Sequence, residues 1–156
     1  MLQPGGQAPS FSLPQLESGA GRLGEGKPTL LVFFETDCPT CRLTIPYLNR
    51  LAQTLDEKAV IIGVSQDGEE PTRELVEQLP VKFPVVLDRG LSVSRQYDPQ
   101  AVPTLFLIDG EGKIESTLVA FDKDELNAMA AELCAIAGVE PFTLAGAHDG
   151  APQTKP

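Results

Sequence analysis

Four apolar runs along the chain lack the apolar–polar alternation of a half-exposed strand. They predict buried strands at residues 29–34, 59–65, 83–87 and 104–108. Continuous runs of this kind are typical of strands that are covered on both faces of a sheet. The turn signal Asp109-Gly110-Glu111-Gly112 follows the last run and predicts a hairpin, with residues 113–119 as its returning strand.

Helical spacing marks the segments between these strands. From Pro39 to about Glu57, apolar side chains recur at intervals of four and three residues and share one face of a helix: Cys41, Ile45, Leu48, Ala52 and Leu55. Pro46 is expected to kink this helix because a main-chain hydrogen bond is lost there. Shorter helical segments are predicted at residues 71–79 and 91–97.

A last helix is predicted after Asp122, whose side chain can cap it, with Glu125 in the capping-box position. It is expected to end near Gly138. Cys134 lies beside its apolar stripe, and we interpret this cysteine as a small buried hydrophobic residue. The alternation of strands and helices, followed by a hairpin and a terminal helix, predicts an α/β sandwich with a mixed central sheet.

The length of 156 residues and the hydrophobic content of 42% suit a single domain with an ordinary core. We assign residues 1–140 to this domain, which includes an N-terminal extension rich in glycine and proline. Residues 141–156 lose all periodicity and are predicted to form a disordered tail. His148, the only histidine, lies in that tail and receives no role.

The formal net charge of −10 argues against nucleic acid and anionic membrane surfaces as partners, because both reward positive charge. No stretch approaches the ~18 apolar residues of a membrane span, and the first residues lack the pattern of a signal peptide. We therefore expect a cytoplasmic monomer, or a periplasmic or other extracytoplasmic protein if a signal or anchor has been removed.

The sequence Cys38-Pro39-Thr40-Cys41 joins a predicted buried strand to the first long helix. Cys38 falls at the helix N-cap, and Pro39 falls at the first helical position, where a missing N–H costs nothing. The free N–H groups and the dipole of a helix N-terminus favour a thiolate at Cys38. Cys41, one turn later, lies on the apolar face. We assign Cys38 as the nucleophile and Cys41 as the resolving thiol of a thiol–disulfide exchange site.

Two other roles remain open to this cysteine pair. One is half of a zinc site, although the chain supplies only Cys134 and His148 as further cysteine or histidine ligands. The other is a pair of unreactive buried thiols, which would suit Cys41 but not a cysteine at a helix start.

The chain resembles the thioredoxin superfamily, in particular its TlpA-like and redoxin-type thiol–disulfide oxidoreductases. The resemblance rests on the cysteine pair, on Pro46, on the N-terminal segment 6–13, and on Val102-Pro103-Thr104 before an apolar strand. It implies a thioredoxin-like three-layer α/β/α sandwich, in which a cis peptide bond at Pro103 packs against the cysteines. An ordinary trans proline at the start of an edge strand is the alternative.

The resemblance also implies which residues meet the substrate. The exposed backbone of Val102 would pair with an incoming peptide, and we expect Pro39, Thr40 and Thr104 to belong to the same binding surface. The partners would be a protein or small-molecule disulfide or thiol, and a redox protein that donates or accepts electrons. The thiols themselves carry the electrons, so we expect no cofactor and no metal.

The chain departs from the superfamily pattern at positions that matter for proton transfer. Val32 stands six residues before Cys38, where the superfamily often has an acidic or amide residue, and Asp37 stands where many members have tryptophan. Glu35 is the candidate to accept the proton of the buried thiol instead. Glu35 and Asp37 together would oppose the thiolate by like charge.

The leading functional prediction is therefore a thiol–disulfide oxidoreductase that acts on protein disulfides. One alternative is a thiol peroxidase of the peroxiredoxin type, but Glu35 and Pro103 stand where that family places a threonine and an arginine. A further alternative is a soft-metal carrier or a redox-linked binding module. Such a carrier would bind a soft metal stoichiometrically and would lack disulfide reductase activity.

Overall fold

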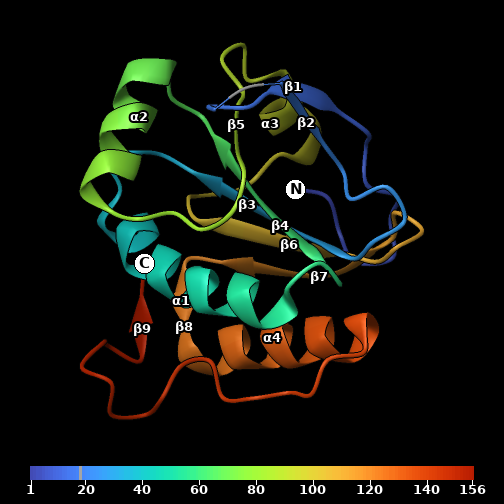
Figure 1. The fold of residues 1–156 in the computed structure, drawn as a ribbon, viewed down its shortest axis with the longest axis vertical. Coiled ribbons are helices and arrows are strands. Elements are labelled where there is room, and N and C mark those ends of the chain that lie inside the picture. Colours follow the sequence, from blue (N-terminus) through green and yellow to red (C-terminus); the bar gives the residue numbers. More distant parts are fainter. Residues whose placement is uncertain (18) are drawn as a thin grey trace.

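A five-stranded mixed sheet forms the centre of the computed structural model, which describes residues 1–17 and 19–156 (Figure 1). Its strands lie in the order β5-β4-β3-β6-β7, with these bounds: β3 Thr29–Phe34, β4 Val60–Ser65, β5 Val85–Leu87, β6 Thr104–Ile108 and β7 Ile114–Val119. β3 is parallel to β4, and β4 is parallel to β5, whereas β6 is antiparallel to both β3 and β7. The mixed α/β architecture expected from the sequence is confirmed.

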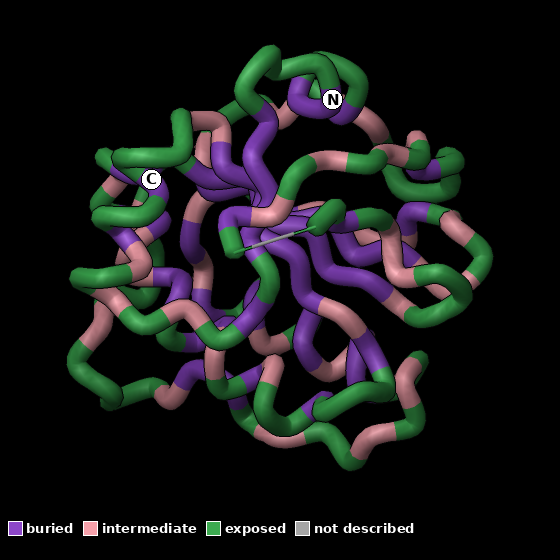
Figure 2. The backbone as a smooth tube through the Cα atoms, turned by 45° about the horizontal axis from the view of Figure 1, so that its top comes forward, coloured by how far each residue is buried: buried purple, intermediate pink, exposed green. Residues whose placement is uncertain are grey.

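Helices and loops cover both faces of this sheet. On one face pack α1 (Pro39–Leu55), α2 (Glu69–Gln78) and α4 (Lys123–Ala137), and on the other pack α3 (Ser92–Tyr97) and the N-terminal segment. Side chains of β3 alternate between the two layers, so that every residue of this strand is buried. Figure 2 shows the same result as a concentration of buried backbone in the middle of the molecule. The unbroken apolar run of β3 is therefore the consequence of a strand with no solvent-facing side.

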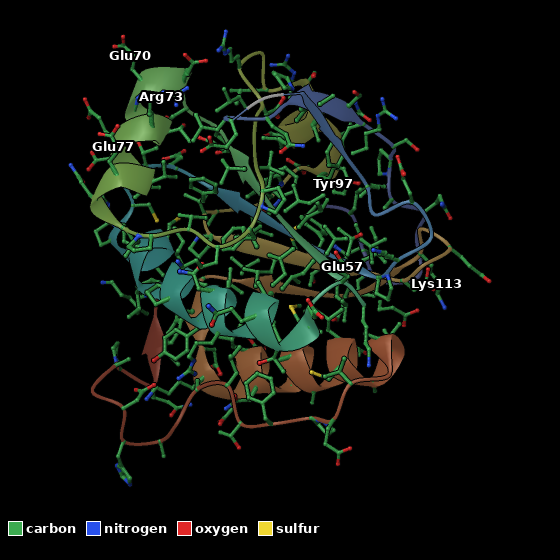
Figure 3. All side chains as sticks on the ribbon, in the orientation of Figure 1. Glu57, Glu70, Arg73, Glu77, Tyr97 and Lys113 are labelled. Atoms are coloured by element: carbon green, nitrogen blue, oxygen red, sulfur yellow. The ribbon has the colours of Figure 1, made fainter. Side chains whose placement is uncertain are left out.

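An aromatic cluster fixes the N-terminal extension on the face away from α1. The rings of Phe33, Tyr97 and Phe106 lie with centroids 5.3 to 5.6 Å apart. The buried Tyr97 hydroxyl donates a hydrogen bond of 2.6 Å to the Pro9 carbonyl, and burial raises the pKa of this hydroxyl. Figure 3 shows Tyr97 on the side of the sheet opposite α1, whereas Arg73 lies on α2 near the surface. Tyr97 therefore connects the extension to the core.

A small antiparallel hairpin of β1 (Ser12–Pro14) and β2 (Ala20–Arg22) lies against the edge of the sheet. Leu16, in the loop that follows β1, is buried, and its main-chain N–H donates to the Val85 carbonyl at 2.9 Å. The hairpin thereby covers β5, which would otherwise leave unpaired main-chain groups at the sheet edge.

The ends of α4 follow the capping signals in the sequence. The Asp122 carboxylate accepts a hydrogen bond of 3.0 Å from the Glu125 main-chain N–H. Gly138 ends the helix with φ of +73°, a conformation that glycine adopts at little cost. Cys134 is fully buried in the core, in agreement with its interpretation as a small hydrophobic residue.

The C-terminal segment, residues 141–156, differs from the disorder that its sequence suggests. Leu144 and Ala145 are buried in the core shared with α1 and α4. Further on, β9 (Thr154–Lys155) pairs antiparallel with β8 (Phe121–Asp122), the short strand before α4. Red in Figure 1, the segment runs back along α4 toward the start of α1.

A buried ion pair holds this segment in place. The Lys123 side chain is almost completely buried, and its ammonium group donates at 2.7 Å to both the Gly146 carbonyl and the Asp149 carboxylate. The Tyr47 hydroxyl of α1 donates to the other Asp149 oxygen. A buried lysine requires such partners. Because the partners are single side chains from distant elements, apolar periodicity within the segment gives no sign of them.

These contacts also shift the pKa values of the Asp149 carboxyl group and the Tyr47 hydroxyl. The hydrogen bonds from Lys123 and Tyr47 hold the pKa of Asp149 far below its usual range. Burial, with the bond to Asp149, raises the pKa of Tyr47 to about 12. The lowered pKa of Asp149 contributes stability that is present above about pH 4 and is lost as the pH falls through the lower pKa of the folded state.

Removal of the Asp149 carboxylate should release the C-terminal segment. In Asp149→Ala we expect main-chain amides such as those of Ala151 and Lys123 to exchange hydrogen at least about fivefold faster, the equivalent of one lost hydrogen bond. Hydrogen exchange followed by mass spectrometry measures this. Glu140→Ala, which removes an exposed carboxylate at the start of the segment, is the control. Unchanged exchange in Asp149→Ala would contradict the proposed role of the ion pair.

Candidate active site

Cys38 forms the N-cap of α1, directly after the loop that leaves β3. Its backbone is extended, and its Sγ accepts a hydrogen bond of 3.1 Å from the Cys41 main-chain N–H. Pro39 occupies the first helical position, as the sequence predicts. The Cys38 sulfur is therefore fixed at the positive end of the helix, and it remains partly open to solvent.

Cys41 lies inside the core, one turn further along α1. Its side chain is only 1% exposed, compared with the half-buried Cys38. Burial raises the pKa of Cys41 well above its ordinary range, and a hydrogen bond between the two thiols acts in the same direction. The pair therefore consists of one accessible sulfur and one protected sulfur that holds its proton.

The loop before β6, the strand that pairs with β3, approaches Cys38. The Val102–Pro103 peptide bond is cis, as the resemblance implies. The Cys38 thiol lies 3.6 Å from the Val102 carbonyl oxygen, to which it donates. Val102 is half-buried, whereas Pro103 and Thr104 are buried. The Thr104 hydroxyl donates to the Ala101 carbonyl, so this side chain orders the loop rather than facing solvent.

A second anchor holds the loop between β3 and α1. The Asp67 carboxylate, just after β4, accepts hydrogen bonds from the Thr36 main-chain N–H and hydroxyl at 2.7 and 2.8 Å. The Arg42 side chain donates to the Thr36 carbonyl at 3.1 Å and to Gln78 at 3.1 Å. Sequence reasoning missed Asp67. Its place at the carboxyl end of the parallel strand beside β3 is the signal that would have identified it.

The acidic residues beside Cys38 both point outward. Glu35 and Asp37 are exposed. The Glu35 main chain makes a hydrogen bond that favours the Cys41 thiolate, whereas the negative charge of its carboxylate favours the thiol. Glu35 thus lies within electrostatic reach of the buried sulfur.

Pro39 and Thr40 differ in their surroundings. Pro39 is exposed at the tip of α1, whereas Thr40 is buried and its hydroxyl donates to the main-chain oxygen of Pro156. The C-terminal segment therefore reaches the residue between the two cysteines. No sequence signal indicated this contact.

Across residues 1–17 and 19–156, no three histidine, cysteine, aspartate or glutamate side chains come together in a way that could hold a metal ion. In the same part of the chain, none of the helices has the length and apolar character required to cross a membrane.

Comparison with known proteins agrees with this geometry. Residues 4–117 match the model of the AhpC/TSA family. The thiol-disulfide oxidoreductase ResA of Bacillus cereus is 35% identical over 122 residues, which are 76% of this chain and 70% of ResA.

Solved structures show the same likeness. One from Chlorobium tepidum, described as a thiol:disulfide interchange protein of the DsbE type, has a TM-score of 0.82 at 27% identity and covers 88% of this chain and 100% of that one. The thioredoxin domain of a Bacteroides vulgatus thiol-disulfide oxidoreductase has a TM-score of 0.71 at 29% identity, covering 78% and 91%.

The difference in burial between the two thiols predicts a difference in alkylation. At neutral pH, iodoacetamide should modify Cys38 of the reduced protein at least about a hundredfold faster than Cys41, because the reagent cannot reach the buried Cys41 sulfur and because burial, which raises the pKa of Cys41, leaves less of the reactive thiolate. Timed quenching with peptide mass spectrometry measures both rates. Equal rates at the two sites would show that Cys41 is not protected as described.

Proposed function

The chain belongs to the AhpC/TSA family of the thioredoxin superfamily and is a thioredoxin-like thiol–disulfide oxidoreductase, and we propose that it works through Cys38 as nucleophile and Cys41 as resolving thiol. The observation that carries this proposal is the hydrogen bond from the Cys41 N–H to the Cys38 sulfur at the start of α1. It stabilises negative charge on the sulfur that a substrate can reach.

In the first step, the Cys38 thiolate attacks one sulfur of a substrate disulfide. The substrate S–S bond breaks, a new S–S bond joins Cys38 to one substrate sulfur, and the other substrate sulfur leaves as a thiolate that takes a proton from solvent. The partial exposure of Cys38 supports this role, because the attacking sulfur must approach along the S–S axis.

In the second step, Cys41 resolves the mixed disulfide. Cys41 loses its proton and attacks Cys38, so that a Cys38–Cys41 disulfide forms and the second substrate thiol is released. The substrate gains two electrons, which the cysteine pair loses. The reverse sequence oxidises a dithiol partner through the same intermediate, and a redox protein returns the pair to its starting state.

The substrate chain is proposed to lie between the cis-proline loop and the tip of α1. The Val102 carbonyl is 3.6 Å from the Cys38 sulfur, and Pro39 is exposed at the start of α1. An extended peptide could pair with the Val102 main chain while its cysteine faces Cys38. Thr40 and Thr104 are both buried, so we assign them to the support of this surface and not to direct contact with the substrate.

Three single variants test the assignment of the cysteines. With a peptide disulfide as substrate, Cys38→Ser should reduce turnover to the uncatalysed rate. Cys41→Ser should accumulate a stable mixed disulfide at Cys38, detectable as an added peptide mass. Cys134→Ala should keep full turnover, because its sulfur belongs to the core beneath α4. If Cys41→Ser turns over normally, the resolving role is wrong.

The wild-type protein and these variants also test the two alternative functions, thiol peroxidase and soft-metal carrier. A thiol peroxidase would consume hydrogen peroxide faster than the peptide disulfide. The chain gives no support to this outcome, because Glu35 and Pro103 stand where the peroxiredoxin family places a threonine and an arginine. A soft-metal carrier would bind one metal ion tightly when reduced and leave the peptide disulfide intact.

We further propose that Glu35 accepts the proton of Cys41 in the second step. If Glu35 acts as this base, Glu35→Gln should slow resolution of the mixed disulfide by about ten- to a hundredfold. If its carboxylate only repels the thiolate, the same variant should speed resolution. Stopped-flow measurement of substrate thiol release shows whether the variant slows or speeds resolution. Asp37→Asn, at a residue that is also exposed, is the control.

A further inference from the structure

We propose that a groove beside the active site binds an acidic segment of the partner protein, next to the partner's reactive cysteine. The groove lies between the outer face of α1 and the C-terminal segment and has a volume of about 490 Å³. Its α1 wall contains Arg42, Leu43, Pro46 and Arg50, and its other wall is formed by Asp149–Ala151. The inference rests on the proposed function, because the partner is the protein whose disulfide or dithiol reacts with Cys38.

The α1 wall starts close to the nucleophile. Arg42, Pro46 and Arg50 recur every four residues, so they follow one face of the helix. Arg42 is about one turn from Cys38, and at a rise of ~1.5 Å per residue Arg50 is ~18 Å along the helix. The groove therefore continues the surface around the reactive sulfur.

The second wall is held firmly enough to define a groove. Asp149 is fixed by Lys123 and Tyr47, and its carboxylate also accepts a hydrogen bond of 3.0 Å from the Ala151 main-chain N–H. Because Lys123 pairs with Asp149, the negative charge of this wall is largely neutralised. The charged groups of the groove that are left to attract a ligand are therefore Arg42 and Arg50.

These arginines stand out in a chain with a formal net charge of −10. Within the described residues, the ion pairs involve neither Arg42 nor Arg50. The Arg50 guanidinium lies 5.4 Å from the centre of the Tyr47 ring and is exposed, so its donors are available to a carboxylate. The planar arginine head group binds carboxylates with two parallel hydrogen bonds.

The chemistry of the groove therefore selects one kind of occupant. Leu43 and Pro46 offer apolar surface between the arginines. A matching segment combines acidic side chains with an apolar one. At ~3.3 Å per extended residue, positions that reach Arg42 and Arg50 lie about two to six residues from the partner's cysteine. Proteins with basic residues at these positions would be repelled by the two arginines and would therefore bind less well.

A pair of peptides tests this inference. Both carry one cysteine as a mixed disulfide with glutathione; one has aspartates two to six residues from the cysteine, and the other has asparagines there. We expect the wild-type protein to reduce the acidic peptide with a kcat/KM about fivefold or more above that of the neutral peptide. This preference should shrink at 0.5 M salt, because the arginine is exposed to screening ions.

Charge reversal locates the source of the preference. Arg50→Glu should abolish or invert it, whereas Arg22→Glu, with the same charge change on β2, should leave it intact. Both variants should reduce 2-hydroxyethyl disulfide, a small uncharged substrate, at the wild-type rate, because Arg50 does not contact the cysteines. Arg42 is left unchanged since it also holds the Thr36 carbonyl.

Two negative results have different meanings. If 2-hydroxyethyl disulfide is reduced normally but the acidic peptide is not preferred, or if Arg50→Glu keeps the preference, the docking groove is wrong and the proposed function stands. If the wild-type protein reduces neither the peptides nor 2-hydroxyethyl disulfide, the proposed function itself fails, and the docking inference fails with it.

Discussion

The hydrogen bond from the Cys41 main-chain N–H to the Cys38 sulfur is the interaction on which the active site depends. It forms only if α1 begins at Pro39, and the start of α1 is set by where β3 ends. β3 is buried on both faces and paired on both edges, so its position cannot shift without loss of core contacts on either side. The rigid middle strand thus holds the Cys38 thiol at a fixed point beyond its carboxyl end.

Burial makes the two thiols different. Cys38 remains accessible at the helix end, while desolvation raises the pKa of Cys41, so that the Cys41 sulfur keeps its proton until a base removes it. The surroundings of the pair come from three distant parts of the chain. Asp67 orders the loop before Cys38, the cis-proline loop approaches the sulfur through Val102, and the C-terminal segment reaches Thr40. Each of these contacts joins a residue of the motif, or of the loop directly before it, to a segment at least 30 residues away, as the separations of 31, 64 and 116 residues show.

Sequence patterns predicted the parts of the structure that depend on local periodicity. The bounds of β3 and β6 agree with the apolar runs, and the cap at Asp122, the end at Gly138 and the helix start at Pro39 follow from short-range signals. The resemblance to a family supplied the cis bond at Pro103, which no periodicity indicates. The ordered C-terminal segment and the anchor at Asp67 both depend on contacts between residues far apart in sequence. The segment is held by the burial of Leu144 and Ala145, by the pairing of β9 with β8 and by the Lys123–Asp149 ion pair, none of which gives it an apolar period of its own. Asp67 is indicated only by its position after a parallel strand, and not by its contact with Thr36.

The central claim is that Cys38 and Cys41 form one reversible disulfide. Its most direct test is equilibration of a Cys134→Ala protein with thiol–disulfide buffers over a range of potentials, with the bond located by peptide mass spectrometry. The account predicts a single two-electron transition, with a slope of about 30 mV for each tenfold change in the ratio of oxidised to reduced protein, and a disulfide that links Cys38 to Cys41. The absence of that disulfide at every potential, or its replacement by stable adducts on separate cysteines, would contradict the account.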